Sequence, residues 1–288
     1  MTPRAMGFQL AQWLSTHLPA RAAFRVAEMA SDVQWRTAAA DRRAVQTNLS
    51  LALGEPVPDA SPLIREVFRN FGRYLVEFFR SHQLTPPDVQ IEGYDYLLQA
   101  QRGRRGIIML TGHLGNWELA GVLVRRLGFP VAGVALPHRD PDMNRLFNRQ
   151  RQRCDLEVIP LDQAATHRCL SVLKNGGLLG LLGDWELTGN SVRTTFLGRE
   201  VSLPRGPALL SLRGQAPILP TFLIREGMWK FRLCFEPPLW PTAHQPIEAS
   251  LRTLVHAYVA TLERYIKRFP SQWLLFQPIT GIRGSGGS

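Results

Sequence analysis

Three features are scarce or missing in this 288-residue chain, and each absence excludes a class of protein. The three cysteines, Cys154, Cys169 and Cys234, form neither a CxxC pair nor a Cys/His zinc pattern, which favours a reducing compartment. No apolar run approaches the roughly 18 residues that suggest a membrane span. No compact apolar segment precedes a cleavage site, as it does in a secretory signal. We therefore expect neither a spanning anchor nor a disulfide framework.

The charge balance is strongly basic. Lys and Arg number 34 against 23 Asp and Glu, so the net charge is +11. Such an excess indicates an anionic partner: nucleic acid, an anionic membrane surface or a phosphorylated substrate. Because the basic residues are scattered among amphipathic segments and no nucleic-acid-binding motif is present, we expect no nucleic-acid partner.

Residues 106–128 contain the pattern around which the chain is organised. The short apolar run 107–110 is typical of a buried strand. A polar turn follows, and apolar residues then recur at helical spacing up to the stop signal at Gly128. Asn116 is a suitable N-cap, and Glu118 stands in the first turn, where the helix dipole favours a carboxylate. The segment is therefore predicted to be strand, loop and helix.

His113 lies in that loop, at the carboxyl end of the predicted strand, where open α/β sheets place their sites. On one continuous helix His113 and Glu118 would point about 140° apart. They meet only if His113 precedes the helix and the chain folds back, which the flanking glycines permit. A Glu beside a His fixes its tautomer and stabilises the imidazolium, so the pair is typical of a general base. The alternative is structural: His113 caps the loop and Glu118 complements the helix dipole.

Buried strands alternate with helices along the rest of the chain. We predict strands at residues 89–91, 107–110, 131–136, 156–160, 178–182, 217–224 and 229–235. Helices are predicted within residues 6–53, and one begins at residue 141. Further helices are predicted at residues 61–82, 94–101, 162–173, 204–212 and 245–268. The last two strands are expected to form an antiparallel pair at the far edge of the sheet. The pattern predicts an α/β fold, with a mostly parallel or mixed central sheet flanked by helices and an N-terminal amphipathic helical region.

A basic stripe follows the strand at 131–136. On the helix that begins at Pro141, Arg145 and Arg149, with Arg153 beyond, are four residues apart and share one face. Arginine suits phosphate because its planar fork forms two parallel hydrogen bonds. The stripe is predicted to bind a substrate phosphate; the alternative is a solvated helix face.

Two further candidate positions lie downstream. Asp184 and Glu186 follow the strand at 178–182, again where a site is expected. Arg205 stands at the start of the helix at 204–212, as a candidate ligand for an oxyanion or a phosphate.

The N-terminal helices combine apolar and basic residues. Phe8, Trp13 and Phe24 alternate with arginines such as Arg21 and Arg25, a composition that suits a membrane interface. The alternative is that these helices simply cover the core. With no spanning segment, we expect peripheral attachment to the cytoplasmic face of the inner membrane.

Several ordered segments resemble one protein family. The string 113–118, HLGNWE, resembles the His-x-x-x-x-acid motif of the bacterial lipid A biosynthesis acyltransferases, a family that includes the phosphatidylinositol mannoside acyltransferases. The glycines 176–177 with Asp184 and the segment 195–198, the run 202–220, and the P-x-Q-W segment 270–273 resemble later blocks of the family. The resemblance covers most of the chain. It departs from the family in a short N-terminal region that lacks the transmembrane anchor of some members.

The resemblance implies a membrane-associated O-acyltransferase with a glycerolipid-acyltransferase-like fold. It would move a fatty acyl group from an acyl thioester, acyl-CoA or acyl-ACP, to a hydroxyl of a glycolipid of the lipid A precursor or phosphatidylinositol mannoside type. His113 would be the general base and Glu118 would orient it, with Asp184 or Glu186 assisting. Backbone amides near Asn116, with Arg205, would stabilise the oxyanion.

No metal and no cofactor beyond the thioester co-substrate are expected, and no nucleophile elbow is present that would suggest an acyl-enzyme. The alternative function is a non-catalytic protein of the same fold that binds anionic membranes.

The predicted organisation is one structural unit in two regions. Residues 1–84 form a membrane-associating helical region and residues 85–283 the α/β acyltransferase region. Residues 284–288 have the composition of a linker remnant and are left out of the fold.

Overall fold

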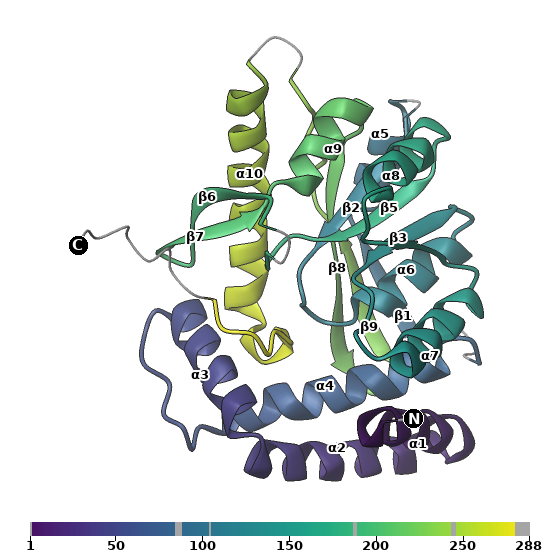
Figure 1. The fold of residues 1–288 in the computed structure, drawn as a ribbon, viewed down its shortest axis with the longest axis vertical. Coiled ribbons are helices and arrows are strands. Elements are labelled where there is room, and N and C mark those ends of the chain that lie inside the picture. Colours follow the sequence, from purple (N-terminus) through teal and green to yellow (C-terminus); the bar gives the residue numbers. More distant parts are fainter. Residues whose placement is uncertain (1, 84–87, 104, 187–188, 243–245, 280–288) are drawn as a thin grey trace.

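The computed structural model describes residues 2–83, 88–103, 105–186, 189–242 and 246–279, and its centre is a seven-stranded sheet (Figure 1). The strands, in spatial order, are β1 (Asp88–Glu92), β9 (Lys230–Phe235), β8 (Ile218–Gly227), β2 (Ile107–Thr111), β5 (Leu178–Leu182), β3 (Val131–Ala135) and β4 (Glu157–Pro160). All neighbours are parallel except β8 and β9, which are antiparallel. The mixed sheet with helices on its faces confirms the predicted fold class.

One detail of the predicted sheet is wrong. The antiparallel pair β8–β9 does not lie at the edge, because β1 adds beyond β9 in parallel. β8 is central and pairs with β2. The strand β1 is short and mostly exposed, which suits the edge of a sheet, where a strand has a neighbour on one side only.

Helices cover both faces because side chains alternate along each strand. Ile107 and Met109 pack in the core under α5 (Tyr94–Gln101) and α6 (Trp117–Arg126). Ile108 and Leu110 point the other way. They meet a core built by α8 (Ala165–Lys174), α9 (Gly206–Gly214) and α10 (Ile247–Arg268).

The N-terminal helices form a separate layer, at the lower end of the molecule in Figure 1. They are α1 (Pro3–His17), α2 (Ala20–Thr37), α3 (Ala39–Leu53) and α4 (Pro62–Arg80). The aromatic stripe of α4, including Phe68, Phe78 and Phe79, is buried. A Cβ at Gly72 would overlap Ser31, so glycine lets α4 approach α2 closely. The predicted boundary between residues 84 and 85 and the segment 284–288 lie outside the described residues.

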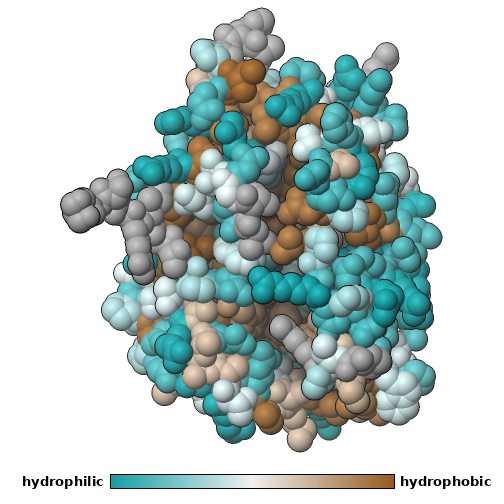
Figure 2. Space-filling model, in the orientation of Figure 1, coloured by the Kyte–Doolittle hydropathy of each residue, from teal (hydrophilic) through white to brown (hydrophobic). Residues whose placement is uncertain are grey.

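The outer sides of α1 and α2 expose large apolar residues. Met6, Leu10 and Trp13 recur at positions i, i+4 and i+7 on α1, and Val26, Met29 and Val33 recur at positions i, i+3 and i+7 on α2. Figure 2 shows hydrophobic patches among hydrophilic ones along this lower edge. None of the helices in the described ranges is long and apolar enough to cross a membrane.

A hairpin that sequence analysis did not predict precedes α9. It joins β6 (Ser191–Phe196) to β7 (Arg199–Pro204) in antiparallel register. Val192, Thr194 and Phe196 are buried while the intervening residues are exposed, so the two-residue period of a strand was present in the sequence. The hairpin packs against α10, its apolar side completing the core on that face of the sheet.

Candidate active site

His113 lies in the loop between β2 and α6, and this loop is fixed from several directions. The amide of Gly115 donates to the carbonyl of Gln272 (2.9 Å), and that of Asn116 donates to the carbonyl of Leu223 (3.0 Å). The carbonyl of His113 accepts a hydrogen bond from the amide of Leu274 (2.6 Å). At Gly115, φ is +64° and a Cβ would overlap the carbonyl of Leu223, so only glycine fits this turn.

The carboxylate that contacts the imidazole is that of Asp184, at the end of β5. Its Oδ1 lies 2.8 Å from His113 Nδ1, and its Oδ2 accepts a hydrogen bond from the His113 amide at 2.8 Å. The indole Nε1 of Trp273 donates a further bond of 2.9 Å to Oδ2. Since an ionised carboxylate only accepts hydrogen bonds, Nδ1 carries the proton and Nε2 is left as the basic nitrogen.

Asp184 is fully buried and yet held in its charged form. Burial alone would raise its pKa, but the adjacent His113 and the three hydrogen bonds outweigh that effect, and the pKa lies below the ordinary value of an aspartate. The His113 side chain keeps 21% of its surface exposed, so the imidazole remains accessible beside its buried partner.

Glu118 does not contact the imidazole, which corrects the predicted His113–Glu118 pair. Its carboxylate binds Arg151 of α7 (Pro141–Gln152), with Nη2 to Oε1 at 2.5 Å and Nε to both oxygens at 3.1 Å. The reason is helical geometry. Trp117 is the α6 residue beside His113, with ring centroids 5.3 Å apart, and the next residue points about 100° away. Glu118 therefore joins α6 to α7.

Asn116 is the N-cap of α6, as predicted, but its side chain is buried and fully used. Its Oδ1 accepts from the Leu119 amide at 3.0 Å, and its Nδ2 donates to Glu77 of α4 at 2.8 Å. Glu77 is in turn paired with Arg225 of β8 at 2.5 Å. This buried chain of hydrogen bonds fastens the N-terminal layer to the carboxyl edge of the sheet, where His113 lies.

Hydrogen bonds within the loop reduce the number of backbone amides that could donate to an oxyanion. Those of Gly115 and Asn116 already donate to backbone carbonyls. In the part of the chain that the structure describes, the amides of Trp117 and Glu118 have no hydrogen-bond acceptor. They begin α6, whose dipole is positive at this end.

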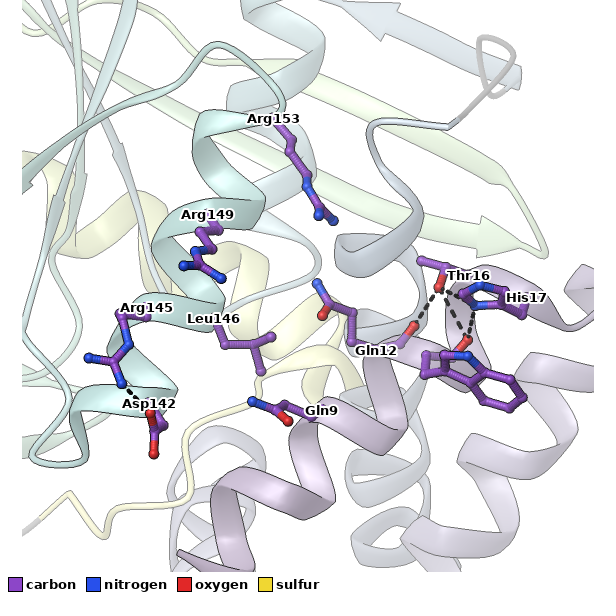
Figure 3. A pocket seen from close by; sticks show the side chains of 10 residues that line it. Gln9, Gln12, Thr16, His17, Asp142, Arg145, Leu146, Arg149 and Arg153 are labelled. Atoms are coloured by element: carbon purple, nitrogen blue, oxygen red, sulfur yellow. Dashed lines mark hydrogen bonds and ion pairs between the residues drawn. The ribbon is translucent and has the colours of Figure 1, made fainter. Parts of the chain in front are cut away.

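The remaining predicted residues are Arg145, Arg149, Arg205 and Glu186. Arg145 and Arg149 line a groove between α7 and α1 together with Arg153, so the three share one face as their spacing predicts (Figure 3). Arg205 donates a long hydrogen bond of 3.4 Å to Glu248 of α10. Glu186 is half-buried two residues beyond Asp184. Burial raises the pKa of the Tyr258 hydroxyl, and the charge of Glu186 adds to that effect.

Two residues of the site were missed by the sequence analysis. Trp273 belongs to the P-x-Q-W segment that resembles the family, so a signal was present, but nothing local indicated that its indole reaches a strand end 89 residues away. Arg151 lies on the predicted helix but off the basic stripe, and it is the residue that the Glu118 carboxylate binds.

The family model of the bacterial lipid A biosynthesis acyltransferases matches residues 8–279. A phosphatidylinositol mannoside acyltransferase of Mycolicibacterium smegmatis is 28% identical over 244 residues, 81% of this chain and 78% of that protein. A lipid A biosynthesis palmitoleoyltransferase of Escherichia coli is 26% identical over 221 residues, 74% of this chain and 69% of that protein. A solved 1-acyl-sn-glycerophosphate acyltransferase of Thermotoga maritima matches with 17% identity and a TM-score of 0.40, over 72% of this chain and 84% of that one. Because the family model covers most of the chain, the protein belongs to the bacterial lipid A biosynthesis acyltransferase family and is an acyl-transferring enzyme.

Proposed function

We propose that the protein transfers a fatty acyl group from an acyl thioester, acyl-CoA or acyl-ACP, to a hydroxyl of a glycolipid of the lipid A precursor or phosphatidylinositol mannoside type. The observation that carries the proposal is the contact between His113 and buried Asp184 at the carboxyl ends of β2 and β5, in a chain of this family. The arrangement supplies a base held in one tautomer and oriented by a permanent negative charge.

In the proposed reaction, His113 Nε2 takes the proton of the acceptor hydroxyl as its oxygen attacks the thioester carbonyl carbon. Asp184 stabilises the imidazolium that forms. The amides of Trp117 and Glu118, at the positive end of α6, stabilise the tetrahedral oxyanion. The carbon–sulfur bond then breaks, and the thiolate leaves with the proton from the imidazolium. No acyl-enzyme is required.

The other predicted site residues have different roles in this proposal from those expected from the sequence. Glu118 is a positioning residue, since its ion pair with Arg151 fixes the start of α6. Arg205 lies against Glu248 of α10, and it is proposed as a phosphate ligand and not as an oxyanion donor. Glu186 adds negative charge near Tyr258 and Asp184.

The acyl chain is proposed to lie over two glycines of the sheet. Gly133 of β3 and Gly180 of β5 are paired in register and point to the α6 side, in the same row as Met109. A Cβ at Gly133 would have no neighbour within 4 Å, and one at Gly180 would meet only backbone at 3.8–3.9 Å. This bare strip of sheet ends a few residues before the His113 loop. It gives an extended chain room to lie flat.

The apolar faces of α1 and α2 support peripheral attachment to an anionic membrane, proposed here as the cytoplasmic face of the inner membrane. Large apolar side chains on a basic N-terminal layer supply the two signals that stable binding needs. A non-catalytic membrane-binding protein of the same fold is the alternative. An intact and buried Asp184 beside His113 favours the enzyme, since a buried charge without a use is costly.

The test is acyl transfer from an acyl thioester to a glycolipid by wild type and His113→Ala. We expect the variant to lose roughly 10²–10⁴-fold in turnover while its unfolding midpoint stays close to that of wild type. His167→Ala, at an exposed position of α8, is the matched control and should keep full turnover. Near wild-type transfer by His113→Ala would show that another group is the base.

A further inference from the structure

A groove of about 470 Å³ separates α1 from α7, and its lining is strongly basic. The residues that line it include Arg145 and Arg149 on α7, Arg153 directly after α7, and Gln9 and Gln12 on α1 (Figure 3). Trp13 of α1 also lines the groove. The Thr2 hydroxyl donates a hydrogen bond to Asp140, the N-cap of α7, and this bond ties the two helices together at one end. The groove is therefore built by packed helices and not by a surface loop.

The charge inside the groove is only partly compensated. Arg145 pairs with Asp142, the one acidic residue of the lining. Within the described residues, Arg149 and Arg153 have no ion-pair partner, although both are exposed to the groove. Two uncompensated guanidinium groups one helical turn apart form a suitable site for an anion with several oxygens, above all a phosphate.

An apolar surface borders the same groove. Trp13 lines it and also belongs to the exposed stripe of α1 with Met6 and Leu10. A ligand seated here would meet arginines at one end and an exposed apolar helix face beside them. Fixed cations next to insertable apolar side chains match the headgroup boundary of a phospholipid monolayer.

The groove is separated from the reacting centre. Successive ring contacts lead from His113 to Trp117, then Tyr74, then Phe78 and finally Phe147 of α7. Phe147 lies on the buried side of the helix whose exposed side carries the arginines. Four aromatic side chains in series therefore lie between the imidazole and the helix that carries the groove arginines.

We propose that this groove binds the phosphodiester headgroup of an anionic phosphoglycerolipid and so seats the enzyme on its membrane. The inference rests on the membrane attachment of the proposed function, but not on the chemistry at His113. The thioester carrier also bears phosphate, and the structure favours the lipid because the groove opens onto the apolar stripe of α1.

The experiment compares co-sedimentation with phosphatidylcholine vesicles and with vesicles that also contain phosphatidylglycerol. The groove variant is Arg149→Gln with Arg153→Gln. The matched control removes the same charge at Arg102 and Arg213, which are exposed at the ends of α5 and α9, far from α1 in Figure 1. Each arginine near an anionic surface contributes roughly a fivefold factor, so the groove variant should lose roughly 25-fold in binding to the anionic vesicles, and the control less than roughly twofold.

A charge-conserving variant separates a site from general attraction. Arg149→Lys with Arg153→Lys keeps both charges but removes the bidentate fork, so a built phosphate site should weaken at least roughly fivefold. Wild-type binding by the lysine variant would overturn the proposal, because attraction of net charge alone would then explain the result. A raised Michaelis constant for acyl-CoA with unchanged vesicle binding would overturn it in favour of the carrier.

Acyl transfer is measured on the same proteins, so the two proposals fail separately. Groove-dependent vesicle binding by a protein without transferase activity would sink only the proposed function. Acyl transfer together with vesicle binding that the groove substitutions do not change would contradict only this inference.

Discussion

The indole of Trp273 and the carboxylate of Asp184 are joined by a buried hydrogen bond of 2.9 Å. The same oxygen accepts the backbone amide of His113, while the other carboxylate oxygen holds the imidazole. Trp273 follows the short helix η1 (Pro270–Gln272), and its backbone bridges to Leu114 in the His113 loop. The C-terminal segment thus fixes both the loop and the carboxylate that contacts the His113 imidazole.

Trp273→Phe tests this positioning role. The ring is retained, so packing changes little, but the buried carboxylate loses one donor. A hydrogen bond to a charged group is worth roughly 1.5–3 kcal/mol, and we expect turnover to fall roughly tenfold or more with a nearly unchanged Michaelis constant. Trp240→Phe, at an exposed tryptophan, is the control. Equal kinetics for the two variants would mean that the indole only fills space.

Asp184→Asn should be far more harmful than the corresponding change at Glu118. An amide cannot stabilise the imidazolium, and it can favour the wrong tautomer of His113, so turnover is expected to fall by roughly 10²–10⁴-fold. The measurement is turnover across a pH series, with circular dichroism to confirm the fold. Wild-type turnover by Asp184→Asn would show that His113 does not require the Asp184 carboxylate.

Glu118→Gln is expected to act on stability. The change leaves Arg151 without a counter-charge in a largely buried pair, at a cost of about 2–3 kcal/mol in unfolding free energy. Turnover should stay within roughly tenfold of wild type, and its pH profile should keep its shape. A changed pH profile with wild-type stability would instead restore Glu118 to direct contact with the chemistry.

Local features of the site were predictable, and long-range pairing was not. The strand, the loop and the N-cap at Asn116 followed from hydrophobic period and capping preference, which act over a few residues. Three carboxylates, Glu118, Asp184 and Glu186, stood at suitable positions. Which of them meets His113 depends on the register of β5 beside β2 and on a partner for Glu118 on another helix. Neither is encoded locally.

The fold shows the same division. Helix and strand positions came from patterning, whereas strand order depends on contacts between distant segments, such as β1 with β9. The hairpin β6–β7 was not predicted, although its alternating pattern was present in the sequence. Period-two alternation across residues 192–196 was the physical signal for it.

Acid should weaken the N-terminal layer through Asp32. This α2 carboxylate accepts hydrogen bonds from Arg65 and Arg69 of α4, all between 2.5 and 2.8 Å. These bonds hold its pKa well below the ordinary value of 3.8. The unfolded chain therefore binds the proton more readily. The stabilisation is complete above that value and is lost as pH falls toward the lower folded pKa.

Asp32→Asn should accordingly lower the unfolding free energy by on the order of 1–2 kcal/mol at pH 5–7, and the difference from wild type should shrink below about pH 4. Urea unfolding at several pH values measures this. Asp59→Asn, at an exposed carboxylate that binds Arg42, should change little at any pH. A difference at Asp32 that persists unchanged to low pH would contradict the ionic origin of the effect.

Gly180→Val tests where the acyl chain lies. A side chain at this position would stand on the bare strip of sheet beside Gly133, where the backbone leaves room for it, so the fold should tolerate a strand-forming residue. If the acyl chain crosses this strip, valine occupies the space of roughly two or three methylenes. Long-chain thioesters should then lose roughly tenfold or more in kcat/KM, while short-chain donors keep theirs. The loss of kcat/KM for long-chain donors in Gly180→Ala should be smaller than that in Gly180→Val. The measurement is a series of donors of increasing chain length, and a parallel loss for all lengths would place the acyl chain elsewhere.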